Sequence, residues 1–460
     1  MRRYEKYKDS GIEWIGEIPE HWEIKKIKHL TKLIGGYAFK SEFFSLEGIP
    51  VIRIGDISDN INFELCNKII SEDISIEFFL NQYDTLIALS GATVGKACYI
   101  NKTPPKAYVN QRVAKIPFQN KFLFYIITSS YIQKQIILTS LGSAQENISN
   151  SQIENLDIAL TNISSEQTAI ATYLDQKTAE IDALITDKKR LLELYEEEKS
   201  AIINEAVTKG LASTRLASTR LASTRLASTS SAAFALGGVG TKKKKVLDES
   251  AALGGVKMKD SGIEWMGEIP AHWEVKRLRH VAKIYGRIGY RGYTTEDLVS
   301  KGEGAITISP SNMKAYVMDF NDCSYLSWAK YEESPEIKIQ NGDILFVKTG
   351  STYGKSSIVE NLPEMATINP QIIVLKEIQC NKKLLWYIIK SNLIQYQVEG
   401  SVVGGTIPTI SQAKINNYEF FLPPSFEEQA QIVNFIDNEL YQIDTKKEKT
   451  QKLIDLLTEY

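Results

Sequence analysis

Apolar side chains recur at alternating steps of four and three residues in two long stretches of the chain. In the first, positions 170, 174, 177, 181, 184, 188, 191, 195, 198 and 202 follow this spacing, and seven of the ten are apolar or aromatic. The second keeps the spacing from position 432 to position 457. Each stretch follows a helix-start signal with acidic residues in the first turn, at 165–167 and at 427–429. A 4/3 repeat is typical of a coiled-coil seam, so we predict two long helices that pack on each other.

Before the first long helix, short runs rich in β-branched residues replace the helical spacing. Residues 48–57 and 83–89 have the pattern of β-strands, and residues 110–116 alternate polar and apolar side chains. Residues 121–138 have a helical pattern. Strands and helices are therefore mixed, and the pattern predicts a globule of the α/β (mixed α+β) class from about residue 20 to residue 160.

One segment occurs twice in the chain. Residues 8–29 read KDSGIEWIGEIPEHWEIKKIKH and residues 259–280 read KDSGIEWMGEIPAHWEVKRLRH, with sixteen of 22 positions identical. The segments 148–160 and 410–422, and the helix starts that follow them, also match at a common offset of 262. The duplication thus covers each half of the chain, a globule followed by a long helix. It predicts two equivalent halves with pseudo-twofold symmetry.

We divide the chain into five parts on this basis. They are an N-terminal globule (1–160), a central long helix (161–210), a low-complexity linker (211–255), a C-terminal globule (256–424) and a C-terminal long helix (425–460). The linker opens with three copies of LASTR at 211–225 and contains a lysine run at 242–245. Tandem identical pentamers indicate a flexible, low-complexity tract, and we interpret the lysine run as solvated.

The composition favours a cytoplasmic protein. The four cysteines are scattered, without a Cys-x-x-Cys pair, which indicates a reducing compartment and argues against a cysteine zinc site. Neither a secretory signal nor a transmembrane-length apolar run is present. The formal net charge of −2 gives no sign of nucleic-acid binding, but basic residues gather at 25–32 and 277–291. Phosphate binding depends on the local field, so this segregation keeps nucleic acid among the candidate partners.

Two glycine-rich loops resemble phosphate binders. They run from Gly91 to Lys96 and from Gly350 to Ser356, each with three residues between the glycines where an ATP-binding P-loop has four. This spacing argues against an ATP site, whereas a turn that offers N–H groups and a lysine to a DNA phosphate fits the pattern. We find no motif of a methyltransferase cofactor loop or a nuclease, no metal ligand set and no catalytic constellation. We interpret His21 and Trp22 as packing residues at the entry to the globule.

Together these features resemble the specificity (S) subunits of type I restriction-modification systems. The resemblance spans nearly the whole chain outside 211–255. It is carried by the segments DSGIEWIGEIPEHWE and DSGIEWMGEIPAHWE, by the run from Gly342 to Lys355, and by the EQ-containing starts of the two long helices. The resemblance implies two target recognition domains, each reading one half of a bipartite double-stranded DNA site, and two antiparallel coiled-coil helices that separate them.

The resemblance also implies partners and a division of labour. Two methyltransferase (M) subunits would dock on the helices, and motor-nuclease (R) subunits would complete the restriction complex. Adenine methylation and DNA cleavage would belong to those partners. This chain would be non-catalytic and hold no cofactor, and the assembled complex would use S-adenosylmethionine, ATP and Mg.

Candidate DNA-binding residues are hydrogen-bond donors within each half of the chain. Such side chains suit base edges or phosphates. They are Arg53, Lys96, Asn110, Gln111 and Arg112 in the first half, and Arg287, Arg291, Lys348, Lys355, Asn369 and Gln371 in the second. Two other function classes stay open at the level of sequence: a stand-alone DNA methyltransferase or nuclease with a cryptic site, and a coiled-coil scaffold that does not read DNA.

Overall fold

The computed structural model describes residues 4–58, 60–70, 74–141, 146–211, 257–263, 267–403 and 407–459. The chain divides into two compact units, Met1–Leu184 and Ile185–Tyr460, and each is described by itself. The predicted linker at 211–255 lies outside the described residues, apart from Leu211. Among the helices that the structure describes, none has a segment long and apolar enough to span a membrane.

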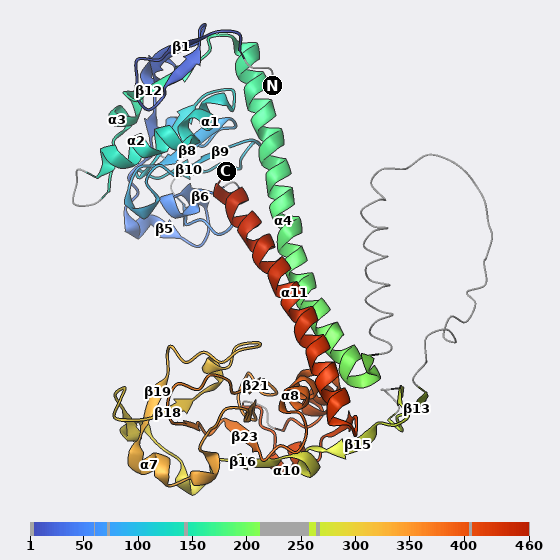
Figure 1. Ribbon diagram of the computed structural model, residues 1–460. Helices are drawn as coiled ribbons and strands as arrows, with labels where there is room; N and C mark the ends of the chain where they lie inside the picture. Colours follow the sequence, from blue (N-terminus) through green and yellow to red (C-terminus); the bar gives the residue numbers. More distant parts are fainter. Residues whose placement is uncertain are drawn as a thin grey trace, which may run out of the picture. The chain divides into compact units, whose positions relative to one another are not determined.

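The first unit is a mixed α/β globule with two four-stranded sheets (Figure 1). One sheet has the strand order β4-β11-β8-β9 and the other β10-β6-β7-β5, while β1 pairs with β2 and β3 with β12. The strands are β1 Tyr7–Asp9, β2 Glu17–Pro19, β3 Glu23–Lys26, β4 Ile34–Gly35, β5 Phe44–Ser45, β6 Ile49–Ile52, β7 Lys68–Ile69, β8 Asp84–Ala88, β9 Ala97–Tyr99, β10 Tyr108–Val109, β11 Val113–Pro117 and β12 Asp157–Leu160. The helices are α1 Phe122–Thr128, α2 Ser130–Ser140, α3 Asn150–Glu154 and the first part of α4 Ser164–Lys209.

The second unit repeats this plan. Its sheets have the orders β16-β23-β20-β21 and β22-β18-β19-β17, which match those of the first unit strand for strand. The strands are β13 Met258–Asp260, β14 Glu268–Pro270, β15 Glu274–Arg277, β16 Lys283–Gly286, β17 Leu298–Val299, β18 Gly304–Ile308, β19 Ser324–Ser327, β20 Ile344–Val347, β21 Ser356–Ile358, β22 Ala366–Ile368, β23 Ile372–Lys376 and β24 Glu419–Leu422. The helices are α6 Leu278–Val281, α7 Trp328–Glu332, α8 Lys382–Lys390, α9 Asn392–Glu399, α10 Gln412–Asn416 and α11 Phe426–Glu459, with the second part of α4.

Residues 121–138 form two helices where the sequence pattern predicted one. The break falls at Ser129, whose extended backbone (ψ 147°) ends α1 and begins α2. The carbonyl of Ser129 accepts the N–H of Gln133 at 3.0 Å, so the second helix starts anew from this residue. Helices α8 and α9 meet in the same way at Ser391. An apolar periodicity that continues across the break hides a single non-helical residue, which is why the pattern did not reveal it.

The second part of α4 and helix α11 run antiparallel within the second unit (Figure 1). Lys199 forms an ion pair with Asp444, and Glu196, one turn earlier, pairs with Lys447, one turn later. This opposite progression of the paired residues establishes the antiparallel direction. The predicted coiled-coil pairing is confirmed here.

The buried seam is shifted from the predicted positions in part of each helix. In α4 the structure buries positions 195, 199, 203, 206 and 207, whereas 198 and 202 are half-buried. In α11 the predicted positions 432, 436, 443 and 450 are buried, but 440 and 454 replace 439 and 453. Ile203, Ala206 and Val207 belong to the core cluster of the second globule. Because α4 packs on this globule as well as on α11, its buried face is rotated from the ideal seam.

The duplicated segment ties the start of each globule to the start of its long helix. Trp22 Nε1 donates to Glu166 at 3.1 Å, and His21 Nε2 lies 2.9 Å from the same carboxylate. In the second half Trp273 Nε1 donates to Glu428 at 2.9 Å, and His272 Nε2 lies 2.8 Å from it. The predicted packing role of His21 and Trp22 thus includes two polar contacts to the first turn of α4.

These contacts make the stability of the first unit sensitive to acid. Burial alone raises the pKa of Glu166, but hydrogen bonds from Thr161, Tyr4, His21 and Trp22 outweigh it and lower this pKa to about 2. Since the folded pKa lies below the ordinary value of about 4.3, the stabilisation is complete above that value and is lost as the pH falls towards 2.

We therefore expect Glu166→Gln to lower the free energy of unfolding by roughly 1–3 kcal/mol at pH 7. The difference from the unsubstituted protein should shrink as the pH falls from about 4.3 towards 2, because protonation then removes the same charge. Urea unfolding at a series of pH values measures this. Substitution of the exposed Glu42 by Gln controls for the loss of one negative charge. A difference that grows on acidification would contradict the prediction.

Candidate nucleic-acid interface

Four loops of the first globule converge at one edge, beyond the ends of β6, β8 and β10. Strands β6 and β10 are parallel, so they end at the same edge, and β11 starts there beside the end of β8. Tyr37 N–H donates to Val109 at 2.8 Å, Gln111 N–H to Tyr37 at 2.9 Å, and Leu89 N–H to Arg112 at 2.9 Å. Asn110 N–H also donates to Ile52, the residue before the segment 53–56, at 3.0 Å, so these main-chain bonds bring the segments 36–37, 53–56, 89–96 and 110–112 to one edge.

Four of the five residues predicted for DNA binding in the first half share one hollow at this edge. Its lining combines polar side chains with the rings of Phe39 and Phe44, and the guanidinium of Arg53 lies 5.9 Å from the centre of the Phe44 ring. The fifth residue, Lys96, is exposed on the neighbouring glycine loop. The hollow is lined by Phe39, Ser41, Phe44, Arg53, Ile54, Asn110, Gln111 and Arg112.

The second globule forms the same edge from equivalent elements. Asn369 N–H donates to Ile308 at 2.9 Å, as Asn110 N–H donates to Ile52 at 3.0 Å. The main chain of Gln371 accepts from Lys348 N–H at 2.8 Å. Lys355 Nζ donates to the carbonyl of Pro310 at 3.2 Å, which joins the glycine loop to the loop after β18. The predicted residues Lys348, Lys355, Asn369 and Gln371 thus lie together at this edge.

The other two predicted residues of the second half are engaged within the protein. Arg287 is 6% exposed, and its guanidinium donates to the carbonyl of Ile368 at 3.2 Å and to Thr367 Oγ1 at 3.0 Å. Arg291 is half-buried and pairs with Glu336 at 3.4 Å. Burial lowers the pKa of Arg287, an effect that nearby Tyr293 and acidic residues oppose. We therefore assign Arg287 the structural role of fixing the end of β22, whereas Gln371, on the turn that follows, is exposed.

The glycine loops use their N–H groups inside the protein. In the second loop, Gly350 N–H donates to Pro408, Tyr353 N–H to Gly350, and Gly354 N–H to Val347. Gly354 has φ +81°, and a Cβ on it would lie 2.8 Å from the side-chain oxygen of Gln395. Gly95 stands in the same relation to Gln133, with φ +82° and 2.8 Å. Both glycines are thus needed for a tight turn against a glutamine. Lys96 at the end of the first loop is exposed, whereas Lys355 at the end of the second is half-buried.

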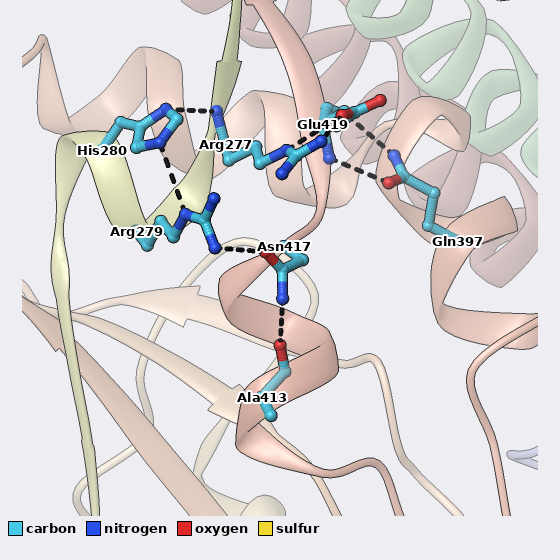
Figure 2. A network of polar contacts seen from close by, with 7 residues as sticks. All are labelled: Arg277, Arg279, His280, Gln397, Ala413, Asn417 and Glu419. Atoms are coloured by element: carbon cyan, nitrogen blue, oxygen red, sulfur yellow. Dashed lines mark hydrogen bonds and ion pairs between the residues drawn. The ribbon is translucent and has the colours of Figure 1, made fainter.

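The basic residues of the duplicated segment are largely held in structural contacts. Figure 2 shows Arg277, whose Nε and Nη2 donate to Glu419 Oε1 at 2.9 and 2.7 Å. Arg279 Nη1 donates to Asn417 Oδ1 at 2.7 Å, and His280 lies beside both arginines. In the first half Lys26 pairs with Asp157 at 2.8 Å. These contacts link β15 to β24 and β3 to β12. Most of the basic side chains of this segment therefore join the first and last strands of each globule.

Sequence reasoning missed the two phenylalanines that line the first hollow, Phe39 and Phe44, and the role of two asparagine turns. Phe39 and Phe44 lie in a stretch without a regular period, so nothing in the pattern connected them to the strand ends. The turns carry a usable signal, however. In both halves an asparagine follows a short apolar strand and its side-chain oxygen accepts the N–H two residues later, at Arg112 and Gln371. Asparagine is favoured at this turn position for that reason.

A family comparison agrees with this duplicated architecture. The family model described as "Type I restriction modification DNA specificity domain" matches residues 19–194 and 270–454. The chain belongs to this family of specificity domains. The predicted resemblance is thereby confirmed, and the two matched segments correspond to the two halves of the duplication.

Individual relatives carry names of the same kind. The type I restriction enzyme MjaVIII specificity subunit of Methanocaldococcus jannaschii is 31% identical over 212 residues, which are 42% of this chain and 47% of the relative. The EcoAI specificity subunit of Escherichia coli is 26% identical over 172 residues, 35% of this chain and 29% of the relative. The chain thus aligns with about half or less of these relatives' length.

A solved structure supports the fold over nearly the whole chain. It comes from work on complex assembly and conformational transition of the type I R-M system, and it has 16% sequence identity and a TM-score of 0.55. The match covers 96% of this chain and 96% of that chain. The likeness shows the architecture of two α/β globules with long helices, which is the predicted fold class.

Proposed function

We propose that this chain is a sequence-specific DNA-binding subunit that reads a bipartite site, one half-site with each globule. The observation that carries the proposal is the edge that occurs twice. Strand order, turn and glycine loop are the same in both globules, while the exposed side chains at the edge differ. A constant frame with variable donors suits the reading of two different half-sites by direct contact with base edges.

We further propose that the chain positions methyltransferase and motor-nuclease subunits on this DNA and carries out no chemistry itself. The names of its relatives as specificity subunits support this division of labour. In the assembled complex S-adenosylmethionine, ATP and Mg would serve those partners. The long helices α4 and α11, duplicated like the globules, offer two equivalent docking positions for two copies of one partner.

Co-expression with a type I methyltransferase subunit that forms a complex with this chain tests the proposal. Sequencing that detects methylated adenine should reveal one bipartite motif with a fixed number of unspecified bases. The chain alone should methylate nothing. Methylation by the chain alone would contradict the non-catalytic assignment, and partner-dependent complexes that bind all DNA sequences equally would contradict sequence reading.

The lysines of the two glycine loops, Lys96 and Lys355, should act on DNA phosphates. We expect Lys96→Ala and Lys355→Ala each to weaken binding to cognate and scrambled DNA alike. Each should also lower the salt dependence of binding by about 0.9 units of log K per log salt, the value for one lost phosphate contact. Gel shifts of the methyltransferase complex over a range of salt concentrations measure this slope.

Lys452→Ala is the matched control, because this exposed lysine lies on α11 and pairs with Glu448. It should leave the slope unchanged. Loss of affinity only on cognate DNA after Lys96→Ala would show that this side chain reads a base, which would contradict the phosphate assignment.

Deleting one LASTR copy should leave the spacing of the half-sites unchanged. Helix α4 ends at Lys209, and Gly210 has φ +71°, a left-handed conformation that does not continue a right-handed helix. Residues inserted or removed after Gly210 therefore do not lengthen α4. If the repeats did extend it, five residues would add about 7.5 Å, roughly two base pairs. Mapping of methylated adenines decides, and a changed number of unspecified bases would contradict the expectation.

A further inference from the structure

The asparagine turn is a part of the edge that both globules share. Asn110 and Asn369 each follow the last residue of a strand that pairs in parallel with its neighbour, and each N–H bonds to that neighbour. Each carbonyl then accepts the N–H three residues later, from Val113 at 2.8 Å and from Ile372 at 3.1 Å. Both segments are thus β-turns with asparagine in first position.

The third position of each turn is held from both sides. The asparagine side chain accepts its N–H, at 3.4 Å for Arg112 and 3.0 Å for Gln371. The carbonyl of the third residue accepts an N–H from the neighbouring strand end: that of Arg112 from Leu89 at 2.9 Å, and that of Gln371 from Lys348 at 2.8 Å. The backbone at this position is therefore fixed, and a fixed backbone limits the entropy lost when the side chain binds a ligand.

The side chains at the third position are exposed and make at most one hydrogen bond within the part of the chain that the structure describes. Arg112 is exposed, and its guanidinium makes no hydrogen bond or ion pair within the residues that the structure describes. Gln371 is exposed too, and its Oε1 accepts only from Asn369 Nδ2, at 3.3 Å. A Cβ on Gly350 would lie 3.4 Å from Gln371 Nε2, so this glycine leaves room for the amide.

We propose that this third turn position is the specificity-determining position of each globule, with Arg112 reading a guanine and Gln371 an adenine. Arginine can donate two hydrogen bonds to O6 and N7 of guanine, and glutamine can bond N6 and N7 of adenine. The inference rests on the proposed function and deepens it. The same frame presents a different side chain in each half, so the two half-sites differ at this base pair.

Exchanging the two side chains tests the inference. In complex with the methyltransferase subunit, Arg112→Gln should change one base pair of the first half-site from G·C to A·T, and Gln371→Arg should do the reverse in the second. On duplexes that differ only at that pair, discrimination should reverse, from roughly 5- to 150-fold for one base to a similar factor for the other. Arg190→Gln makes the same exchange at an exposed arginine of α4 that pairs with Glu193, away from the edge, and should keep the guanine preference.

A second measurement uses the unsubstituted protein, so it does not depend on how the variants fold. Duplexes with 7-deazapurines at one position at a time lack the N7 acceptor. Binding should fall about fivefold or more at one guanine of the first half-site and one adenine of the second. Unchanged half-sites in both variants, or no effect of any 7-deazapurine, would overturn the inference. Absence of a bipartite motif with the unsubstituted protein would instead overturn the proposed function itself.

Discussion

Exchanging residues 30–150 for the equivalent segment of another family member will change one half-site of the recognised DNA and leave the other as it was. The physical reason is that each edge is built within its own half. In the first globule the loops 36–37, 53–56, 89–96 and 110–112 all lie inside the exchanged segment. Each mismatched base pair costs about 1–3 kcal/mol, so a half-site that differs at several pairs loses most specific binding to the original DNA.

The exchange must respect the joints between this segment and the rest of the first unit. The core cluster combines Leu123 and Ile126 from the segment with Ile158 and Leu160 from β12. Lys121 also pairs with Asp175 of α4 at 2.5 Å. A donor segment with equivalent residues at these contacts is therefore the suitable choice. Methylation mapping is the measurement, and a change in both half-sites would show that the globules do not read DNA independently.

Trp273→Ala should be among the most destabilising single substitutions in the second unit. The indole is 1% exposed within the core cluster, and its Nε1 donates to Glu428 at 2.9 Å. Loss of a buried tryptophan side chain costs about 3–5 kcal/mol, because transfer energy is lost and a cavity remains. Removing the donor also deprives the Glu428 carboxylate of a hydrogen bond. Urea unfolding followed by circular dichroism measures the loss.

The duplication supplies a matched comparison for this substitution. Trp22 occupies the equivalent position and donates to Glu166, but it is only partly buried. Trp22→Ala should therefore cost less than Trp273→Ala. Trp273→Phe keeps most of the apolar volume and loses the donor, so it should cost about 1–3 kcal/mol. Equal losses for both alanine variants would show that burial does not set the difference.

Much of the fold follows from local patterns in the sequence. The segment around 83–89 is β8, the helix start at 165–167 lies in the first turn of α4, and the duplication appears as two globules with identical strand orders. The break at Ser129 and the rotated seam of α4 did not follow. Both depend on what the element packs against, which a periodicity of apolar residues does not contain.

The candidate site was predicted as a set of hydrogen-bond donors in each half, and the structure sorts that set. Asn110, Arg112 and Gln371 lie on the turns at the edge, whereas Arg287 is buried and bonds to the end of the strand before one of them. Arg112 and Arg287 look alike in the sequence, because each lies next to a strand: Arg112 directly before β11 and Arg287 directly after β16. Their difference arises from long-range contacts, because Thr367 and Ile368 enclose only the second.

The sequence by itself determined that the chain consists of two equivalent halves, each with an α/β globule and a long amphipathic helix. Identity between distant segments and the 4/3 spacing are properties of the amino-acid sequence alone, so they do not depend on the tertiary structure. The tertiary structure alone decided which loops meet at one edge and which donors remain exposed there. Parallel pairing of β6 with β10 joins residues more than 50 positions apart, and no local pattern encodes such a pairing.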